Sequence, residues 1–173
     1  MQDQAQERIA LQQLQELRRR YWERLFRATI EMSEAELRVT LKHRSPARRF
    51  AAAYVVGERL LEWQDDLIPL LEDRSEAVRQ GSRRSLIILS FLALNPEEAR
   101  RLRSRQGSGA VTPLSELNKP ADYGPEPGAK PVARSQAVKQ WKAWWADHKP
   151  RPRKTDQLVT VEDEKLEGVK RWR

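Results

Sequence analysis

The sequence predicts an all-α protein, and three observations support that class. Good helix formers fill long stretches of the chain, among them residues 3–32, which contain neither glycine nor proline. Capping residues and prolines then divide the chain into segments of helical length. No stretch between residues 1 and 104 alternates apolar and polar residues for long enough to form a strand, and β-branched residues are few.

Residues 1–32 are expected to form one long amphipathic helix. Apolar residues recur there at three- and four-residue spacing: Leu14, Leu17, Tyr21, Leu25 and Ala28. The first turns, residues 2–15, are rich in glutamine and poor in large apolar side chains, so we expect them to fray or to project from the body.

Capping signals divide the next segment, residues 33–104, into shorter helices. Ser33 and Glu36 have the order of a capping box, in which the hydroxyl accepts from an opening amide and the glutamate reaches back. Short polar side chains at Ser45, at Asp73 to Ser75 and at Asn95 are expected to accept from the opening amides of three further helices. The expected helices are 34–43, 46–62, 65–72, 76–93 and 96–104.

The composition changes after this segment. Residues 105–134 contain four of the seven glycines and five of the ten prolines, which predicts a loop. Its apolar residues Leu114, Leu117 and Tyr123 are available to hold it against the helices. Residues 135–149 are predicted to form a helix rich in tryptophan, and residues 150–173 a basic, flexible tail.

The sequence repeats itself at an offset of thirty residues. Comparing residues 37–49 with 67–79 at this offset gives six identities in thirteen positions, at Leu37, Leu41, Arg44, Ser45, Ala47 and Arg49. At twice the offset, residues 75–80 meet the similar residues 135–140. Such a period is typical of stacked helical hairpins, in which no unit can bury its apolar face alone.

The second unit resembles the turn of a HEAT repeat. The family pattern is Leu-x-x-Leu-Leu-x-Asp, a short turn and then Val-Arg, which the chain matches at Leu67, Leu70, Leu71, Asp73, Val78 and Arg79. The first unit departs from the pattern, with His43 in place of the aspartate and Arg48 in place of the valine. The resemblance covers residues 33–93 well and 135–148 loosely. It implies a curved solenoid with the second helix of each hairpin on the concave side.

Composition restricts the chemistry that the chain can support. There are no cysteines and only two histidines, His43 and His148, neither of which has a second ligand at metal spacing, so we expect no metal site and no cofactor. The net charge of +8 is spread along the chain, with 13 basic and 11 acidic residues in 33–104. The longest apolar run, residues 86–94, is too short to cross a bilayer. We expect a cytoplasmic location by default, while export after removal of a signal stays open.

Two groups of residues are the candidates for binding. Arg44, Arg48, Arg83 and Arg84 are expected to line up across the stacked repeats and to bind a partner, with salt bridges to nearby carboxylates as the open alternative. Arg49, Arg79 and Asp73 hold the structural positions of the resembled family, and we expect a structural role for them.

The tryptophans of the last helix form the other group. Trp141, Trp144 and Trp145 are expected to cap the array by packing on residues 76–93, with one of the adjacent pair left partly exposed. A base-stacking platform next to lysines is the alternative. His148 is expected to have a local role at the end of its helix.

Taken together, these residues predict a non-enzymatic scaffold or interaction module. It would bind a protein or peptide along the second helices, and its partner's identity and its oligomeric state stay open. The alternative is binding of a nucleic-acid backbone by the arginines. For a third possibility, an enzyme of the HEAT-like kind, the sequence offers no acid, base or nucleophile.

Overall fold

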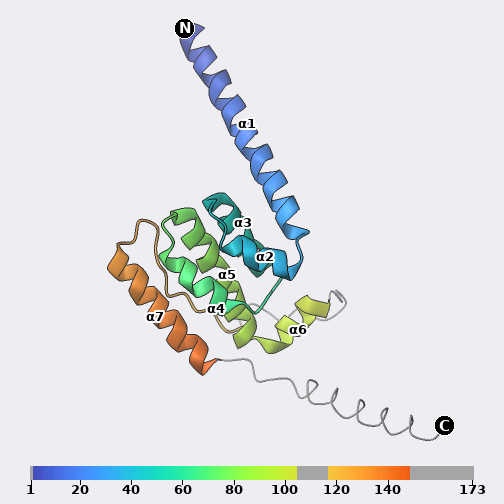
Figure 1. Cartoon of the computed structure of the whole chain (residues 1–173), viewed down its shortest axis with the longest axis vertical. Coiled ribbons are helices and arrows are strands. Elements are labelled where there is room, and N and C mark those ends of the chain that lie inside the picture. The colour runs from blue at the N-terminus through green and yellow to red at the C-terminus, as the bar shows by residue number, and fades with distance from the viewer. Residues whose placement is uncertain (1, 105–116, 149–173) are drawn as a thin grey trace, which may run out of the picture.

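The computed structural model describes residues 2–104 and 117–148, and every described regular element is helical (Figure 1). Helix α1 (Gln2–Ile30) projects from a compact body of shorter helices. The predictions for Leu114 and for the tail 150–173 concern residues outside the described ranges.

The body consists of two helical hairpins and a helix that follows them. The first hairpin contains α2 (Glu34–Leu41) and α3 (Pro46–Glu58), and the second contains α4 (Gln64–Leu67), the 3-10 helix η1 (Ile68–Glu72) and α5 (Glu76–Leu94). The two hairpins meet through α3 and α5. Helix α6 (Pro96–Ser104) continues from the end of α5. An all-α fold is thus confirmed.

The predicted helices 65–72 and 46–62 differ clearly from the structure. The expected helix 65–72 is divided into α4 and η1, because Pro69 has no N–H to donate and cannot continue the α-helical ladder. The expected helix 46–62 ends at Glu58, and Leu60 then takes a left-handed conformation with φ of 55°. Beside this turn the Arg59 guanidinium donates to the carbonyl of Met32 at 2.7 Å.

Of the predicted caps, the capping box at Ser33 is complete, and Asp73 rather than Ser75 accepts an amide before α5. The Ser33 hydroxyl accepts from the Glu36 amide at 3.3 Å, and the Glu36 carboxylate accepts from the Ser33 amide at 2.8 Å, which is the predicted capping box. Ser45 and Ser75 make no side-chain cap bond. The Asn95 side chain instead bonds Asn118, across 23 residues of chain.

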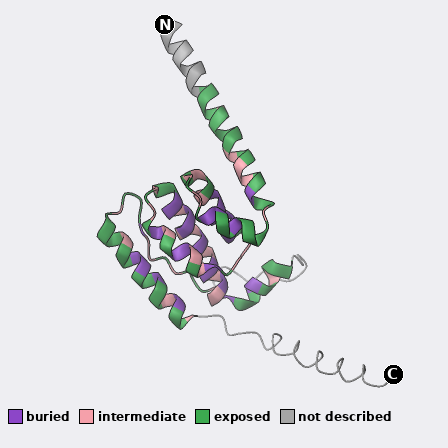
Figure 2. Ribbon diagram, in the orientation of Figure 1, coloured by how far each residue is buried: buried purple, intermediate pink, exposed green. Residues whose placement is uncertain are grey.

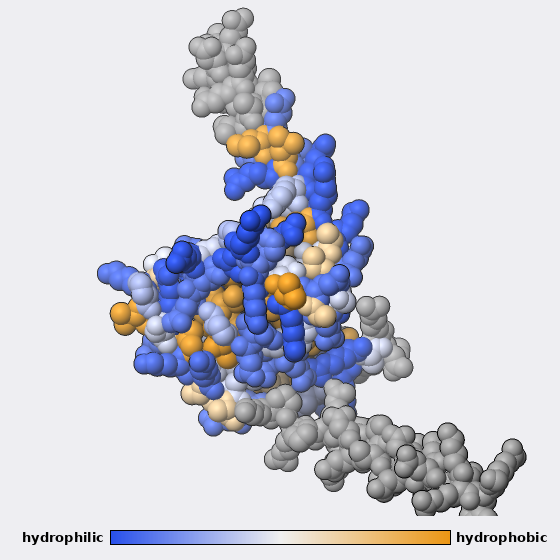
Figure 3. All heavy atoms as spheres, in the orientation of Figure 1, coloured by the Kyte–Doolittle hydropathy of each residue, from blue (hydrophilic) through white to orange (hydrophobic). Residues whose placement is uncertain are grey.

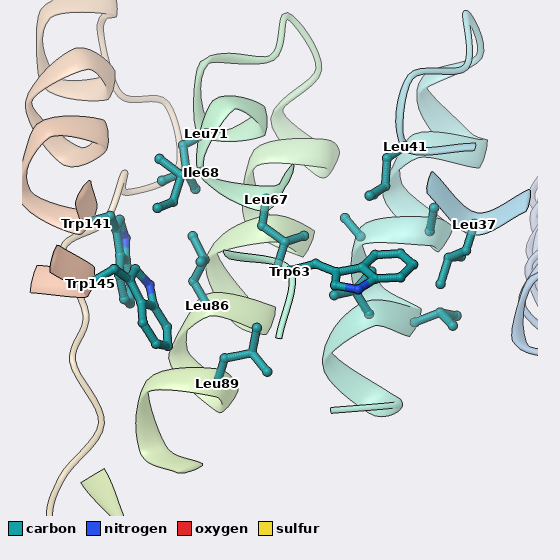
Figure 4. Packing of buried hydrophobic residues seen from close by; sticks show 14 of the residues in the cluster. Leu37, Leu41, Trp63, Leu67, Ile68, Leu71, Leu86, Leu89, Trp141 and Trp145 are labelled. Carbon is teal, nitrogen blue, oxygen red and sulfur yellow. The ribbon is translucent and has the colours of Figure 1, made fainter. Parts of the chain in front are cut away.

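A single apolar core connects the two hairpins with the last helix (Figures 2 and 4). The sequence predicts one continuous core for residues 33–93 that contains eight residues, and all eight are buried: Leu37, Leu41, Ala51, Val55, Leu67, Leu71, Val78 and Leu86. Leu41 and Leu71, thirty residues apart, are 2% and 0% exposed.

Helices α3 and α5 approach each other closely because both have a glycine at the crossing. A Cβ on Gly57 would lie 2.5 Å from Ser85 Oγ, and a Cβ on Gly81 would lie 2.7 Å from the Phe50 ring. The Ser85 hydroxyl donates to the Ala53 carbonyl at 2.7 Å, which satisfies a buried polar group between the helices.

The segment 117–130 runs along α5 without regular structure. Ser90 Oγ accepts from the Ala121 amide at 3.0 Å, and Asn95 Oδ1 accepts from the Asn118 amide at 2.8 Å. Helix α7 (Pro131–Asp147) begins four residues before the expected start at 135. Its backbone lies against η1, and segment 117–130 follows part of α5. Its Trp141 and Trp145 reach the core beside Leu86 (Figure 4).

Candidate partner-binding surface

The two hairpin turns share one pattern of arginine hydrogen bonds. Arg49 Nη1 donates to the carbonyls of His43 and Arg44 at 2.7 and 3.0 Å. Thirty residues later, Arg79 Nη1 donates to the carbonyls of Asp73 and Arg74 at 2.7 and 3.2 Å. Both arginines therefore satisfy free carbonyls at the end of a first helix, which is a structural role.

The acceptor that organises each turn also recurs. Asp73 Oδ1 accepts from the Ser75 amide at 2.8 Å, and His43 Nδ1 accepts from the Ser45 amide at 2.9 Å. The histidine that departs from the family pattern thus makes the same turn bond through an imidazole nitrogen. Unlike Asp73, His43 has no carboxylate that could form an ion pair with an arginine of a preceding hairpin.

Asp73 also connects the two hairpins. Its carboxylate receives Arg49 Nε at 2.7 Å and Arg49 Nη2 at 2.9 Å, a bidentate pair in which the side chains are 16% and 9% exposed. Burial opposes ionisation of Asp73, but the bonds from Arg49 and from the Ser75 amide outweigh it, so the pKa of this carboxyl lies below its ordinary value.

Arg83, predicted to bind a partner, is engaged within the chain. Its guanidinium holds Asp122 at 2.8 and 2.7 Å and Glu126 at 3.0 and 2.7 Å, and so clamps segment 117–130 to α5. The bonds to Asp122 raise the pKa of Arg83, and the same bonds lower the pKa of Asp122. Arg83 therefore acts as a clamp within the described chain, and its role in binding a partner stays a prediction.

Arg84 is held on both sides by the preceding hairpin. It donates to Glu58 at 2.6 Å, and its guanidinium carbon lies 3.9 Å from the centre of the Tyr54 ring. Its side chain is nevertheless 40% exposed, so part of it stays accessible to a partner.

Arg44 and Arg48 are exposed and make no side-chain hydrogen bond or ion pair with any described residue. They do not continue a row with Arg83 and Arg84. The thirty-residue offset matches Arg83 and Arg84 with Ala53 and Tyr54, which are not basic. The four arginines therefore do not occupy equivalent places on successive hairpins.

The tryptophans of α7 close one side of the body. Trp141 and Trp145 are buried, and Trp144 is half-buried. Trp141 Nε1 donates to the Gly124 carbonyl at 3.2 Å, and its ring meets Tyr123 edge-on with a centroid distance of 5.3 Å. His148 stacks on Trp144 at 4.1 Å, and its Nδ1 lies 2.8 Å from the Trp144 carbonyl oxygen at the end of the helix. This geometry suits a cap.

The outer face of the second helix is covered by α1 in the first hairpin, and among the described residues it carries a hollow in the second. On α3, Phe50 and Tyr54 pack against Trp22 and Phe26 of α1, with centroid distances of 5.4 Å for Trp22 to Phe50 and 5.1 Å for Phe26 to Tyr54. The thirty-residue offset matches Phe50 and Tyr54 with Gln80 and Arg84 of α5. On α5 the corresponding face has a hollow of about 370 Å³, here called the α5 hollow and lined by Gln80, Arg83, Arg84, Ile87 and Ile88.

The α5 hollow combines an apolar floor with polar edges. Ile87 and Ile88 are half-buried and present apolar surface. Gln80 Nε2 donates to the Pro125 carbonyl at 3.1 Å, and the carboxylates of Glu58, Asp122 and Glu126 neutralise Arg83 and Arg84. Such a surface suits an apolar side chain flanked by peptide groups.

The sequence analysis named Arg83 and Arg84 but missed Gln80, Ile87 and Ile88 of the α5 hollow, because the sequence does not show which distant segments cover α5. Residues 2–104 and 117–148 contain no group of three side chains that could hold a metal ion, and no helix long and apolar enough to span a membrane. Comparison with protein-family models, curated proteins and solved structures finds no match to this chain.

Proposed function

We propose that the chain is a non-enzymatic interaction module with HEAT-like helical hairpins, and that it binds an extended segment of another protein in the α5 hollow. The observation that carries the proposal is the difference between the two hairpins. The outer face of α3 is covered by the aromatic residues of α1, whereas among the described residues the equivalent face of α5 carries a partly apolar hollow beside segment 117–130.

The contacts around the hollow favour a peptide over a nucleic acid. Arg83 pairs with two carboxylates and Arg84 with one, so this surface offers no excess positive charge to a phosphate backbone. Ile87 and Ile88 give an apolar side chain a surface to bury, and the exposed part of Arg84 can donate to a peptide carbonyl.

The alternative, binding of a nucleic-acid backbone, rests on Arg44 and Arg48, which are exposed and unpaired among the described residues. Two cations at one hairpin turn neutralise few phosphates, so we rank this alternative second.

Selection of peptides from a displayed random library, using the full chain as bait, tests the proposal. Peptides that bind the α5 hollow are expected to lose at least about tenfold in affinity for Ile88→Gln, because an apolar contact is replaced by a polar group. Val39→Gln is the matched control, since Val39 is 71% exposed and lies on α2.

Thermal unfolding of both variants shows whether the body stays folded. Peptides that bind Ile88→Gln as tightly as the parent chain would refute the assignment of the hollow. Failure to select any peptide would refute the proposal that this chain recognises extended segments.

A further inference from the structure

Helix α1 carries an apolar stripe that no described part of the chain covers. Leu14, Leu17 and Tyr21 are 54%, 65% and 53% exposed, and they recur at intervals of three and four residues. Figure 3 shows hydrophobic surface on the projecting helix. This is the spacing with which one helix packs along another. We call these three residues the α1 stripe.

The other sides of α1 are already engaged. Glu16 pairs with Arg19 at 2.9 Å and with Arg20 at 2.8 Å, and Arg19 pairs with Glu23 at 3.0 Å, which places an ion-pair network opposite the stripe. Nearer the body, Trp22 and Phe26 pack on α3, at about 130° around the helix from the stripe.

A projecting helix of this kind needs a partner for its apolar side. Most of the stability of a protein helix comes from burial of its amphipathic face rather than from intrinsic propensity. The first turns of α1 extend beyond the body (Figure 1). The face with Trp22 and Phe26 does not overlap the stripe, so a second helix can lie along the stripe while α3 stays in place.

We propose that the α1 stripe is the contact between two copies of this chain, and that the two α1 helices pair in an antiparallel arrangement with Leu14 of each copy against Leu17 of the other. A twofold axis that passes between the Leu14 and Leu17 contacts makes the interface self-complementary, as a symmetric dimer requires. Helix α1 has 29 residues, or about 43 Å, so the helices can overlap over several turns.

The charges along α1 favour a second copy of this chain as the partner helix. They also favour antiparallel over parallel pairing. In the sequence of α1, residues 2–17 contain three acidic residues and one basic residue, whereas residues 18–30 contain five arginines and one glutamate. Antiparallel pairing brings the basic half of each helix beside the more acidic half of the other. Parallel pairing would bring the five arginines of both copies together, which is unfavourable.

Sedimentation equilibrium of the full chain tests the self-association. We expect dimers at micromolar concentration, and we expect Leu14→Gln with Leu17→Gln to weaken association by more than about a hundredfold, because four leucines leave the contact. The control is Val39→Gln with Val132→Gln, which removes two side chains that are 71% and 83% exposed on the body. It should leave association unchanged. Equal unfolding midpoints of the variants show that the body is intact.

A spin label distinguishes the two directions of pairing. The chain has no cysteine, so Arg27→Cys introduces a single labelling site. In the antiparallel pair the two labels lie about 35 Å apart along the axis, and in a parallel pair they lie side by side. Two labels that lie side by side would refute the antiparallel arrangement. A chain that stays monomeric throughout would refute the dimer, and binding of that monomer to anionic phosphatidylserine vesicles through Leu14 and Leu17 would assign the stripe to a membrane surface instead.

Discussion

The ion pair between Arg49 and Asp73 gives the sharpest test of how the two hairpins are joined. We consider Asp73→Asn, which removes the charge but keeps an oxygen that can accept from the Ser75 amide. The pair is bidentate, with N–O distances of 2.7 and 2.9 Å, and both side chains are largely excluded from water. The substitution leaves the Arg49 charge buried without its partner, which typically costs about 3–5 kcal/mol of unfolding free energy.

A double-mutant cycle isolates this pair from the other bonds of Asp73. Arg49→Gln and Asp73→Asn, alone and combined, are unfolded with urea, and the coupling is expected to exceed about 2 kcal/mol. A second pair between the hairpins is a matched control. Arg38 and Asp66 are separated by 3.5 Å and their side chains are 58% and 31% exposed, so their coupling should be below about 1 kcal/mol.

The result that would refute this reasoning is a coupling between Arg49 and Asp73 no larger than that of the control pair. It would mean that water screens the pair and that the other contacts between α3 and α5, apolar and polar, join the hairpins.

Three further predictions concern stability at low pH, the buried Trp141 indole and the binding of duplex DNA. The pKa of Asp73 and that of Asp122 lie below the ordinary 3.8, so the stability they contribute is present above about pH 4 and is lost as the pH falls through the folded-state values. Urea midpoints measured from pH 6 to about pH 2 should fall less steeply in Asp122→Asn, and equal slopes would contradict this. Trp141→Ala should lower the unfolding free energy by about 3–5 kcal/mol in urea titrations, because the indole is fully buried, and an unchanged midpoint would remove the capping role. Labelled duplex DNA should bind only weakly in anisotropy titrations and dissociate near physiological salt, whereas submicromolar binding lost on changing Arg44 and Arg48 to alanine would favour the nucleic-acid alternative.

The local rules of the sequence were sufficient for the helices and for the core. Periodic apolar residues, good helix formers and proline at first helical positions act over one or two turns, so an all-α chain and most helix starts could be read directly. The thirty-residue offset matched Leu41 with Leu71 and Arg49 with Arg79, and these pairs have corresponding burial and hydrogen bonds. The HEAT-like assignment itself stays a prediction.

Only the tertiary structure decided which arginines were available for binding. Arg83 and Asp122 are 39 residues apart, and no local pattern signals that a loop will return to α5 and be clamped there. The same applies to α1, whose Trp22 and Phe26 cover α3 but leave α5 open. Charge and burial depend on which distant segments meet in space, whereas helix formation depends mainly on neighbours along the chain. The sequence therefore predicts which helix carries the candidate site and which residue types it offers. It does not predict the surface that these residues form with distant segments.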